Sequence, residues 1–301
     1  MLANNNEAII NKLAKNSVKT NKKQYAILFF TIILSAFMLF CVFTIGMTYL
    51  NSSRLQNTRL NGAEYDIVTM NGFTSEQLNT LQQNENIRSV GIESYAGFIQ
   101  STEYDKTVEI GLLWCDEVFW DNLMSPARTK LDGHYPQNKN ELMVTKDILK
   151  TCGNENLSVG DSLILTYENN TGVYTDEFVI SGIWDGYGDT SAGFVSKAFY
   201  DETGYDLKNN GILCIKLNCN YVFPTTIQSI EKSLDFSDRQ IFAPTGYIEN
   251  SFKLLLGICG LALVICLSAY LLIYNILYLS VSGKIRYYGL LQSLGMTKKQ
   301  L

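Results

Sequence analysis

The chain has 301 residues, and only 18% of them are charged, below the roughly 25% of an average soluble protein. The charges are unevenly placed. Residues 1–50 hold five Lys/Arg and one acid, residues 51–250 hold 14 Lys/Arg and 28 Asp/Glu, and residues 251–301 hold five Lys/Arg and no acid. This pattern excludes a simple soluble enzyme. It also argues against a nucleic-acid partner, because an acidic surface repels phosphates.

Two long uncharged segments lie at the borders of the acidic region. One runs from Lys23 to Arg54 and the other from Lys253 to Lys284. A membrane-spanning helix needs about 20 apolar residues, so we predict transmembrane helices at residues 25–50 and 254–281. The first segment is too long for a signal peptide and ends without a small-x-small cleavage site.

The basic residues beside these segments predict the orientation. Positive residues near span ends stay on the cytoplasmic side. They are Lys12, Lys15, Lys19, Lys22 and Lys23 before the first span, and Lys284, Arg286, Lys298 and Lys299 after the second. We therefore expect a multi-pass membrane protein with both termini in the cytoplasm and residues 51–250 outside.

The N-terminal segment, residues 1–24, has an amphipathic pattern. Its lysines fall on one side of a helix, and the other half carries Ile9, Ile10, Leu13, Ala14 and Val18. We predict a helix in the membrane interface with its lysines near anionic head groups. The alternative is a solvated basic leader that only fixes topology.

Residues 51–250 are predicted to form an α+β extracytoplasmic core domain of two small lobes. The capping-box pair Thr74 and Gln77 opens a short helix through Leu81, and Pro224 starts another over 225–234. Turn signals lie at 132–133, 160–161 and 186–188. Short strands rich in β-branched and aromatic residues are predicted at 64–70, 87–100, 108–114, 141–145, 161–167, 177–184 and 211–217.

The domain carries no pattern of catalytic residues. His134 is the only histidine, which excludes a His-rich metal site, and its DGHYP context is typical of a turn. The acidic cluster near the tryptophans is typical of a solvated helix face, and WDGYGDT lacks the carboxylate spacing of an EF-hand. We therefore expect no enzyme activity, no metal and no cofactor. The acidic residues concerned are Asp116, Glu117, Asp121, Asp185 and Asp189.

The cysteines leave the disulfide pattern open. Four lie in the exported region, and four cysteines allow three full pairings: Cys115, Cys152, Cys214 and Cys219. Cys214 and Cys219 are separated by an odd offset in a predicted strand, so they should point to opposite faces and not pair with each other.

Residues 284–301 form the most informative segment. Tyr287, Leu290, Leu291 and Leu294 stand at i, i+3, i+4 and i+7 and place one apolar stripe on a short cytoplasmic helix. Gly295 suits its C-terminal cap, and Thr297 can cap a second helix. An exposed apolar stripe of this kind needs a protein partner or the membrane surface. A juxtamembrane helix lying on lipid is the simpler alternative.

The same residues resemble the cytoplasmic segment of the FtsX-like, MacB-type ABC transporter permeases. The resemblance lies in Tyr288-Gly289-Leu290-Leu291 followed by Ser293-Leu294-Gly295-Met296-Thr297-Lys298-Lys299-Gln300. Weaker matches to the family's extracytoplasmic core domain occur in order: Gly133-x-x-Pro136, Glu141 to Val144, Val159 to Leu163 and Phe178 to Ile183. Tyr288 departs from the family, where many members carry an acidic residue.

The resemblance implies a permease subunit that is worked by a separate ABC ATPase, because the chain has no Walker A pattern. It implies a dimer of permeases and an extracytoplasmic partner such as a peptide, a lipoprotein or a wall hydrolase. Two further spans would follow residue 301. The implied ATPase-docking residues are Tyr287, Gly289, Leu290, Leu291, Leu294, Gly295 and Thr297.

Two other classes share the two-span topology. A membrane sensor or receptor with an extracytoplasmic input domain would normally continue from the second span into a long helical module, whereas Gly295 interrupts the helix here. A chain-length regulator of surface polysaccharide would have a domain dominated by long helices, and this one is rich in predicted strands.

Overall fold

The computed structural model describes residues 11–12, 15–16, 19–100, 110–187 and 192–293. The chain divides into two compact units: residues 1–49 with 255–301, which we call the helix unit, and residues 50–254, which we call the sheet domain.

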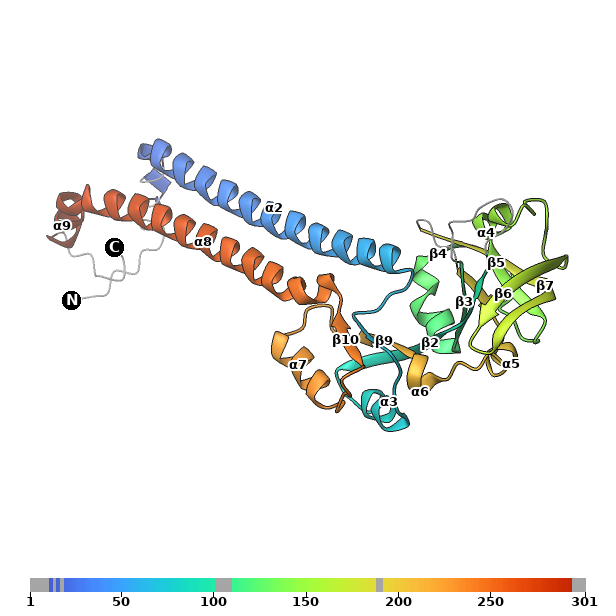
Figure 1. Ribbon diagram of the computed structural model, residues 1–301. Coiled ribbons are helices and arrows are strands. Elements are labelled where there is room, and N and C mark those ends of the chain that lie inside the picture. The colour runs from blue at the N-terminus through green and yellow to red at the C-terminus, as the bar shows by residue number, and fades with distance from the viewer. Residues whose placement is uncertain (1–10, 13–14, 17–18, 101–109, 188–191, 294–301) are drawn as a thin grey trace. The chain divides into compact units, whose positions relative to one another are not determined.

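The helix unit contains two helices of membrane-spanning length and composition. They are α2 (Lys22–Asn61) and α8 (Gly246–Ser282), and their most apolar stretches are 0% and 6% buried. The two helices run alongside each other (Figure 1), and a Cβ added at Gly46 would lie 2.6 Å from Cδ1 of Ile258. A small residue at such a crossing lets membrane helices approach closely. The prediction of two transmembrane helices on either side of an α+β domain is confirmed.

Both long helices extend beyond the predicted spans at the domain side. α2 continues past residue 50 to Asn61, and α8 already begins at Gly246, so their domain-side turns belong to the sheet domain. A third helix, α9 (Ile285–Ser293), follows α8 after a short turn. The apolar residues of the predicted N-terminal amphipathic helix lie outside the described residues.

In its described residues, the sheet domain contains ten strands and several short helices. The strands are β1 (Ile67–Met70), β2 (Ile87–Ile99), β3 (Ile110–Cys115), β4 (Arg128–Gly133), β5 (Glu141–Thr145), β6 (Ser162–Asn169), β7 (Gly172–Gly186), β8 (Ala192–Val195), β9 (Ile212–Leu217) and β10 (Ile241–Pro244). The helices are α3 (Ser75–Gln82), the π-helical η1 (Val118–Leu123), the 3-10 turn η2 (Ser125–Ala127), α4 (Lys146–Thr151), α5 (Lys197–Tyr200), α6 (Leu207–Asn210) and α7 (Pro224–Lys232).

The strand pairings arrange the domain as two lobes that share strand β2. In the first lobe, the strand order is β10-β1-β9-β2, with all neighbours antiparallel. In the second lobe, β2, β3, β8, β5, β7 and β6 pair in a closed ring, because β6 pairs with both β7 and β2. Strand β4 is not part of the ring and pairs with the C-terminal residues of β7, 182–186. The first half of β2 pairs with β9 and its second half with β3. The predicted α+β domain of two small lobes is confirmed.

A glycine permits closure of the ring. Strands β2 and β6 pair only through Phe98 with Glu168 and Ile99 with Tyr167. The preceding residue, Gly97, lies at a register shift, and a Cβ on it would approach the carbonyl oxygen of Glu168 to 2.8 Å. Only a residue without a side chain lets the two strands come together at this point.

Three apolar clusters form the core. The first fills the ring, with Leu112, Leu142, Phe178 and Ile180 among its buried members. The second packs under α3 and α7, and the third lies on the opposite face of the first lobe beside η1. Strand β9 shows the alternation that separates the last two: Leu213 and Ile215 belong to the second cluster and Cys214 to the third.

Several local predictions match the structure closely. The capping box of Thr74 and Gln77 is present with both of its hydrogen bonds, and Pro224 occupies the first turn of α7. One turn prediction is wrong, because Asp132-Gly133 ends strand β4 instead of turning the chain. Strands β4, β8 and β10 were not predicted. They are short or largely exposed, so neither length nor alternation marks them.

Candidate functional site

The predicted docking residues that the structure describes lie on α9. Leu290 is 64% exposed and Tyr287 is 46% exposed, so this helix presents apolar surface. Gly289 has open space where a side chain would be. Leu291 lies within the span of α9, but its side chain is outside the described residues, as are Leu294, Gly295 and Thr297 altogether.

A second site lies where the domain-side turns of α2 and the start of α8 meet strands β1 and β9. Its centre is Lys216 of β9, whose ammonium group lies 3.1 Å from Oε1 of Glu64 and 3.2 Å from Oδ2 of Asp66. Lys216 is 5% exposed and Asp66 is 2% exposed. Arg54 on α2 lies 3.8 Å from the same Glu64 oxygen. We call Arg54, Glu64, Asp66, Lys216 and Thr245 the joint.

Asp66 connects the joint to both helices and to two strands. Its Oδ2 accepts a hydrogen bond from the backbone N–H of Leu217 at 2.9 Å, and its own N–H donates to the carbonyl of Ile215 at 2.9 Å. Its carbonyl accepts from the N–H of Thr245 at 2.8 Å, directly before α8 begins. Glu64, two residues earlier in the chain, pairs with Arg54 of α2. Asp66 and Glu64 together therefore link the entry and exit points of the domain.

The electrostatics of the joint are those of a desolvated ion pair. Burial raises the pKa of Asp66, and the Lys216 ammonium and the Leu217 N–H oppose that rise. Burial also raises the pKa of the nearby Tyr247 on α8 to about 12. Removing one partner of such a pair leaves an uncompensated charge, so the two carboxylates and the ammonium fix one geometry.

The joint was not predicted from the sequence, although a signal was present. Lys216 stands in GILCIKL, a strand that is otherwise apolar on both faces. A lysine in such a strand requires a buried anion. Asp66 stands in the same kind of setting in EYDIVTM, one residue before an apolar strand.

The predicted solvated acidic face near the tryptophans is wrong for one residue. Oδ1 of Asp116 accepts hydrogen bonds from the N–H groups of Ile92 at 2.9 Å and Phe119 at 2.8 Å. The side chain therefore fixes η1 to strand β2. Glu117 and Asp121 are exposed, as the prediction had it. His134 follows β4 in an exposed stretch, with Nδ1 3.0 Å from the carbonyl oxygen of Tyr135.

A carboxylate also enters the third apolar cluster. Glu93 stands on β2 opposite Cys115 of β3 and Ile212 of β9. Burial raises the pKa of Glu93 to about 7. Burial also raises the pKa values of Tyr65 and Cys214, and the Glu93 carboxylate raises them further. Within the described residues, no cation pairs with Glu93.

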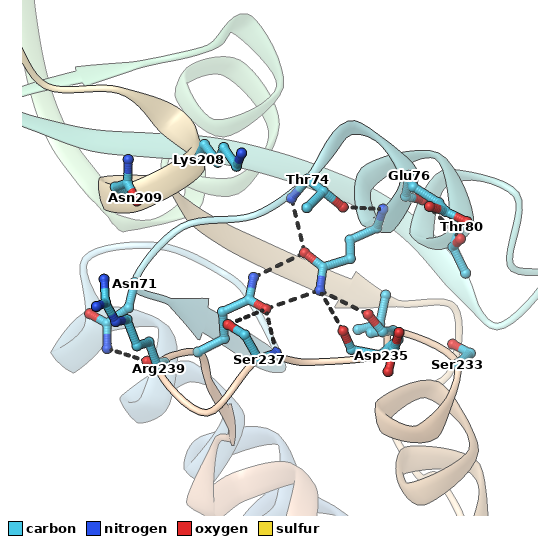
Figure 2. Close-up of a pocket in the computed structure, with 13 residues that line it drawn as sticks. Asn71, Thr74, Glu76, Thr80, Lys208, Asn209, Ser233, Asp235, Ser237 and Arg239 are labelled. Carbon is cyan, nitrogen blue, oxygen red and sulfur yellow. Dashed lines mark hydrogen bonds between the residues drawn. The ribbon is translucent and has the colours of Figure 1, made fainter.

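A polar hollow of about 450 Å³ lies between α3, α6 and the loop before β10 (Figure 2). Its floor is an amide pair in which Gln77 and Gln240 bond to each other at 3.0–3.1 Å. Gln77 also donates to the carbonyl of Leu234, and Gln240 donates to that of Gly72. These amide groups already form hydrogen bonds within the protein. A ligand would therefore find its polar partners mainly at the rim of the hollow, where Lys208 is exposed.

The cysteines are all described, and none forms a disulfide. Cys115 and Cys214 are buried and Cys152 is partly buried, whereas Cys219 is exposed just beyond β9. Among the described residues, no group of three His, Cys, Asp or Glu side chains could hold a metal ion.

No family model matches the chain, and no curated protein matches it. Similar solved structures exist. The periplasmic region of MacB from Actinobacillus actinomycetemcomitans has a TM-score of 0.42 at 12% identity and covers 64% of this chain and 95% of its own. The extracellular domain of the noncanonic ABC-type transporter YknZ from Gram-positive bacteria has a TM-score of 0.39 at 12% identity and covers 60% and 98%. A permease domain from Porphyromonas gingivalis has a TM-score of 0.37 at 9% identity and covers 60% and 89%.

Proposed function

We propose that this chain is a permease subunit of an ABC transporter of the FtsX-like, MacB type. A separate cytoplasmic ATPase would supply the energy, and the chain would convert ATP-driven closure of that ATPase into movement of its sheet domain outside a bacterial plasma membrane. One observation carries the proposal. The segment from Tyr288 to Gln300, directly after the second span, resembles the cytoplasmic segment of that family.

The coupling segment supports the cytoplasmic half of this proposal. The side chain of Leu290 on α9 is 64% exposed and stands among basic residues. An apolar side chain this exposed gains free energy when a partner covers it. An ATPase that docks here would act on α9 and, through the chain, on α8.

The joint supports the other half. A displacement of α8 would reach Asp66 through its hydrogen bond to Thr245, and Asp66 is held to β9 by Lys216 and Leu217. Lys216 also binds Glu64, which pairs with Arg54 of α2, so an independent shift of the two helices would strain the Thr245 hydrogen bond or the Arg54–Glu64 pair. Transmission of force needs an element of this kind, which both ends can bias.

Polar side chains on α8 support assembly with other membrane helices, including those of a second permease subunit. Asn275 is exposed, and the rings of Tyr270, Tyr274 and Tyr278 stack along one side at 6.2 and 6.1 Å. Amide and phenol groups within hydrocarbon are stabilised when they bond to a neighbouring helix.

Co-purification with the ATPase tests the proposal. The full chain is co-expressed with an ABC ATPase encoded next to it, and the ATPase retained on the tagged permease is quantified. We expect Leu290→Asp to reduce retention at least about tenfold, since loss of one apolar contact and burial of a charge exceed 1.4 kcal/mol. The double variant Leu291→Asp with Leu294→Asp should do the same.

Gln292→Asp is the matched control, because it places the same charge on the exposed surface of the same helix. It should retain the ATPase. Unchanged retention in the leucine variants would show that the ATPase docks elsewhere.

A membrane sensor is the second candidate, and the polar hollow between α3 and α6 favours it, since a small polar ligand could occupy that volume. Binding of a ligand there without any ATPase partner would support the sensor. The polysaccharide regulator is disfavoured, because the helices that lie wholly within the described sheet domain are short and its core is built on strands.

A further inference from the structure

An exposed phenylalanine marks the start of helix α7. Phe223 is 60% exposed and occupies the N-cap position, where its side chain makes no capping hydrogen bond. Ser, Thr, Asp and Asn are the residues that stabilise this position, so helix formation does not account for the phenylalanine. The core does not account for it either, because neighbouring Val222 and Ile227 face inward instead.

The ring of Phe223 packs near the start of α8, on the turn that directly precedes the uncharged segment. Its centroid lies 4.5 Å from that of Phe252, and the next residue, Lys253, is exposed. All three residues belong to the sheet domain, and α8 is one uninterrupted helix from Gly246 to Ser282.

The length of the uncharged segment gives the position of this aromatic pair along the membrane normal. Thirty residues separate Lys253 from Lys284. At about 1.5 Å per residue they extend roughly 45 Å, which matches the full thickness of a bilayer with its head groups. Phe252 therefore stands at the level of the lipid head groups, and Phe223 stands beside it.

We propose that Phe223, together with Phe252 and Lys253, forms a lipid-contact surface by which the start of α7 rests in the interfacial layer of the bilayer. Aromatic side chains favour this layer, and a lysine beside them can bind lipid phosphate. The surface is continuous with the membrane-spanning helix, so the membrane is the occupant that the geometry provides. The proposal depends on the second span and not on an ATPase.

Depth-dependent fluorescence quenching tests this surface. The full-length Phe223→Trp variant is reconstituted into vesicles of phosphatidylcholine and phosphatidylglycerol, and the signal of the wild type, whose three tryptophans are buried, is subtracted. The vesicles carry a nitroxide on the head group, near the carboxyl end of an acyl chain or near its methyl end. We expect the added emission to be lost with the first two quenchers and retained with the third.

Ile164→Trp is the matched control, because Ile164 is 69% exposed on β6 in the ring lobe. Its emission should be retained with all three quenchers. Equal quenching of the two variants would overturn the proposal. A second probe is Phe223→Cys carrying a spin label, in a background in which the exposed and partly buried native cysteines are replaced by serine: Cys41, Cys152, Cys219, Cys259 and Cys266. Its accessibility to oxygen should exceed its accessibility to a water-soluble nickel complex, and the reverse ratio would also overturn the proposal.

Discussion

Glu93 is an ionisable residue whose environment opposes its charge. It stands in the third apolar cluster between Cys115 and Ile212, and burial raises its pKa from 4.5 to about 7. The folded protein therefore binds this proton more tightly than the unfolded chain does. The resulting stabilisation is fully present below about pH 4.5 and is lost as the pH rises through 7.

We expect Glu93→Gln to remove this pH dependence. Glutamine stays neutral, so the variant should be more stable than the wild type at pH 8, by up to roughly 3 kcal/mol for a shift of this size. Denaturant unfolding of the full chain, followed through its buried tryptophans, measures the difference. The exposed Glu117→Gln is the control and should follow the wild type. Parallel pH profiles for wild type and Glu93→Gln would contradict the prediction.

Strand β9 is linked to its surroundings by a buried ion pair. Lys216 joins it to Glu64 and Asp66, next to β1, and all three groups are withdrawn from water to a large degree. The contribution of such a pair to stability is modest when compared with an apolar replacement, but breaking it is costly. The pair fixes the position of β9 relative to the segment before β1.

We expect Lys216→Met to destabilise the sheet domain by about 3–5 kcal/mol, because Asp66 would remain buried without its cation. Denaturant unfolding reports the loss. Lys139→Met is the matched control, since it breaks the exposed pair of Lys139 with Glu202 and should change stability little. A similar effect of both variants would mean that the buried pair has no special role.

Local sequence predicted those elements whose signals are local. The capping box at Thr74 and the proline at 224 specify helix starts by themselves, and the alternation in 161–167 specifies a half-buried strand. Strands β8 and β10 are four residues long, and they exist because a neighbouring strand pairs with them. The joint likewise depends on residues about 150 positions apart, and the local signal at Lys216 does not show which acid pairs with it.

For the whole molecule, charge and hydropathy were sufficient to predict two spans on either side of a large domain, because membrane insertion depends on summed composition. The closed ring of the second lobe was not predicted, since closure depends on which strands pair. Of the candidate site, sequence placed Tyr287 and Leu290 on a helix, as the structure has them.

The predicted orientation can be checked with a native cysteine. Cys219 is exposed in the sheet domain, whereas Cys115 and Cys214 are buried. We expect a membrane-impermeant maleimide added to intact cells to modify Cys219, because that residue should face outward. Cys219→Ser should remove most of the labelling, because the other cysteines of the sheet domain are buried or, for Cys152, partly buried. Modification of Cys219 only after the cells are lysed would place the domain in the cytoplasm.

Strand β2 has a consequence for how the domain can move. Its backbone runs through both lobes, with its first half paired to β9 and its second half paired to β3. Hinges normally form in a few loop residues, and no loop separates the lobes along this strand. A force on the first lobe therefore reaches the second through the covalent backbone of β2. We expect the domain to rotate as one rigid body, without a hinge opening between its lobes.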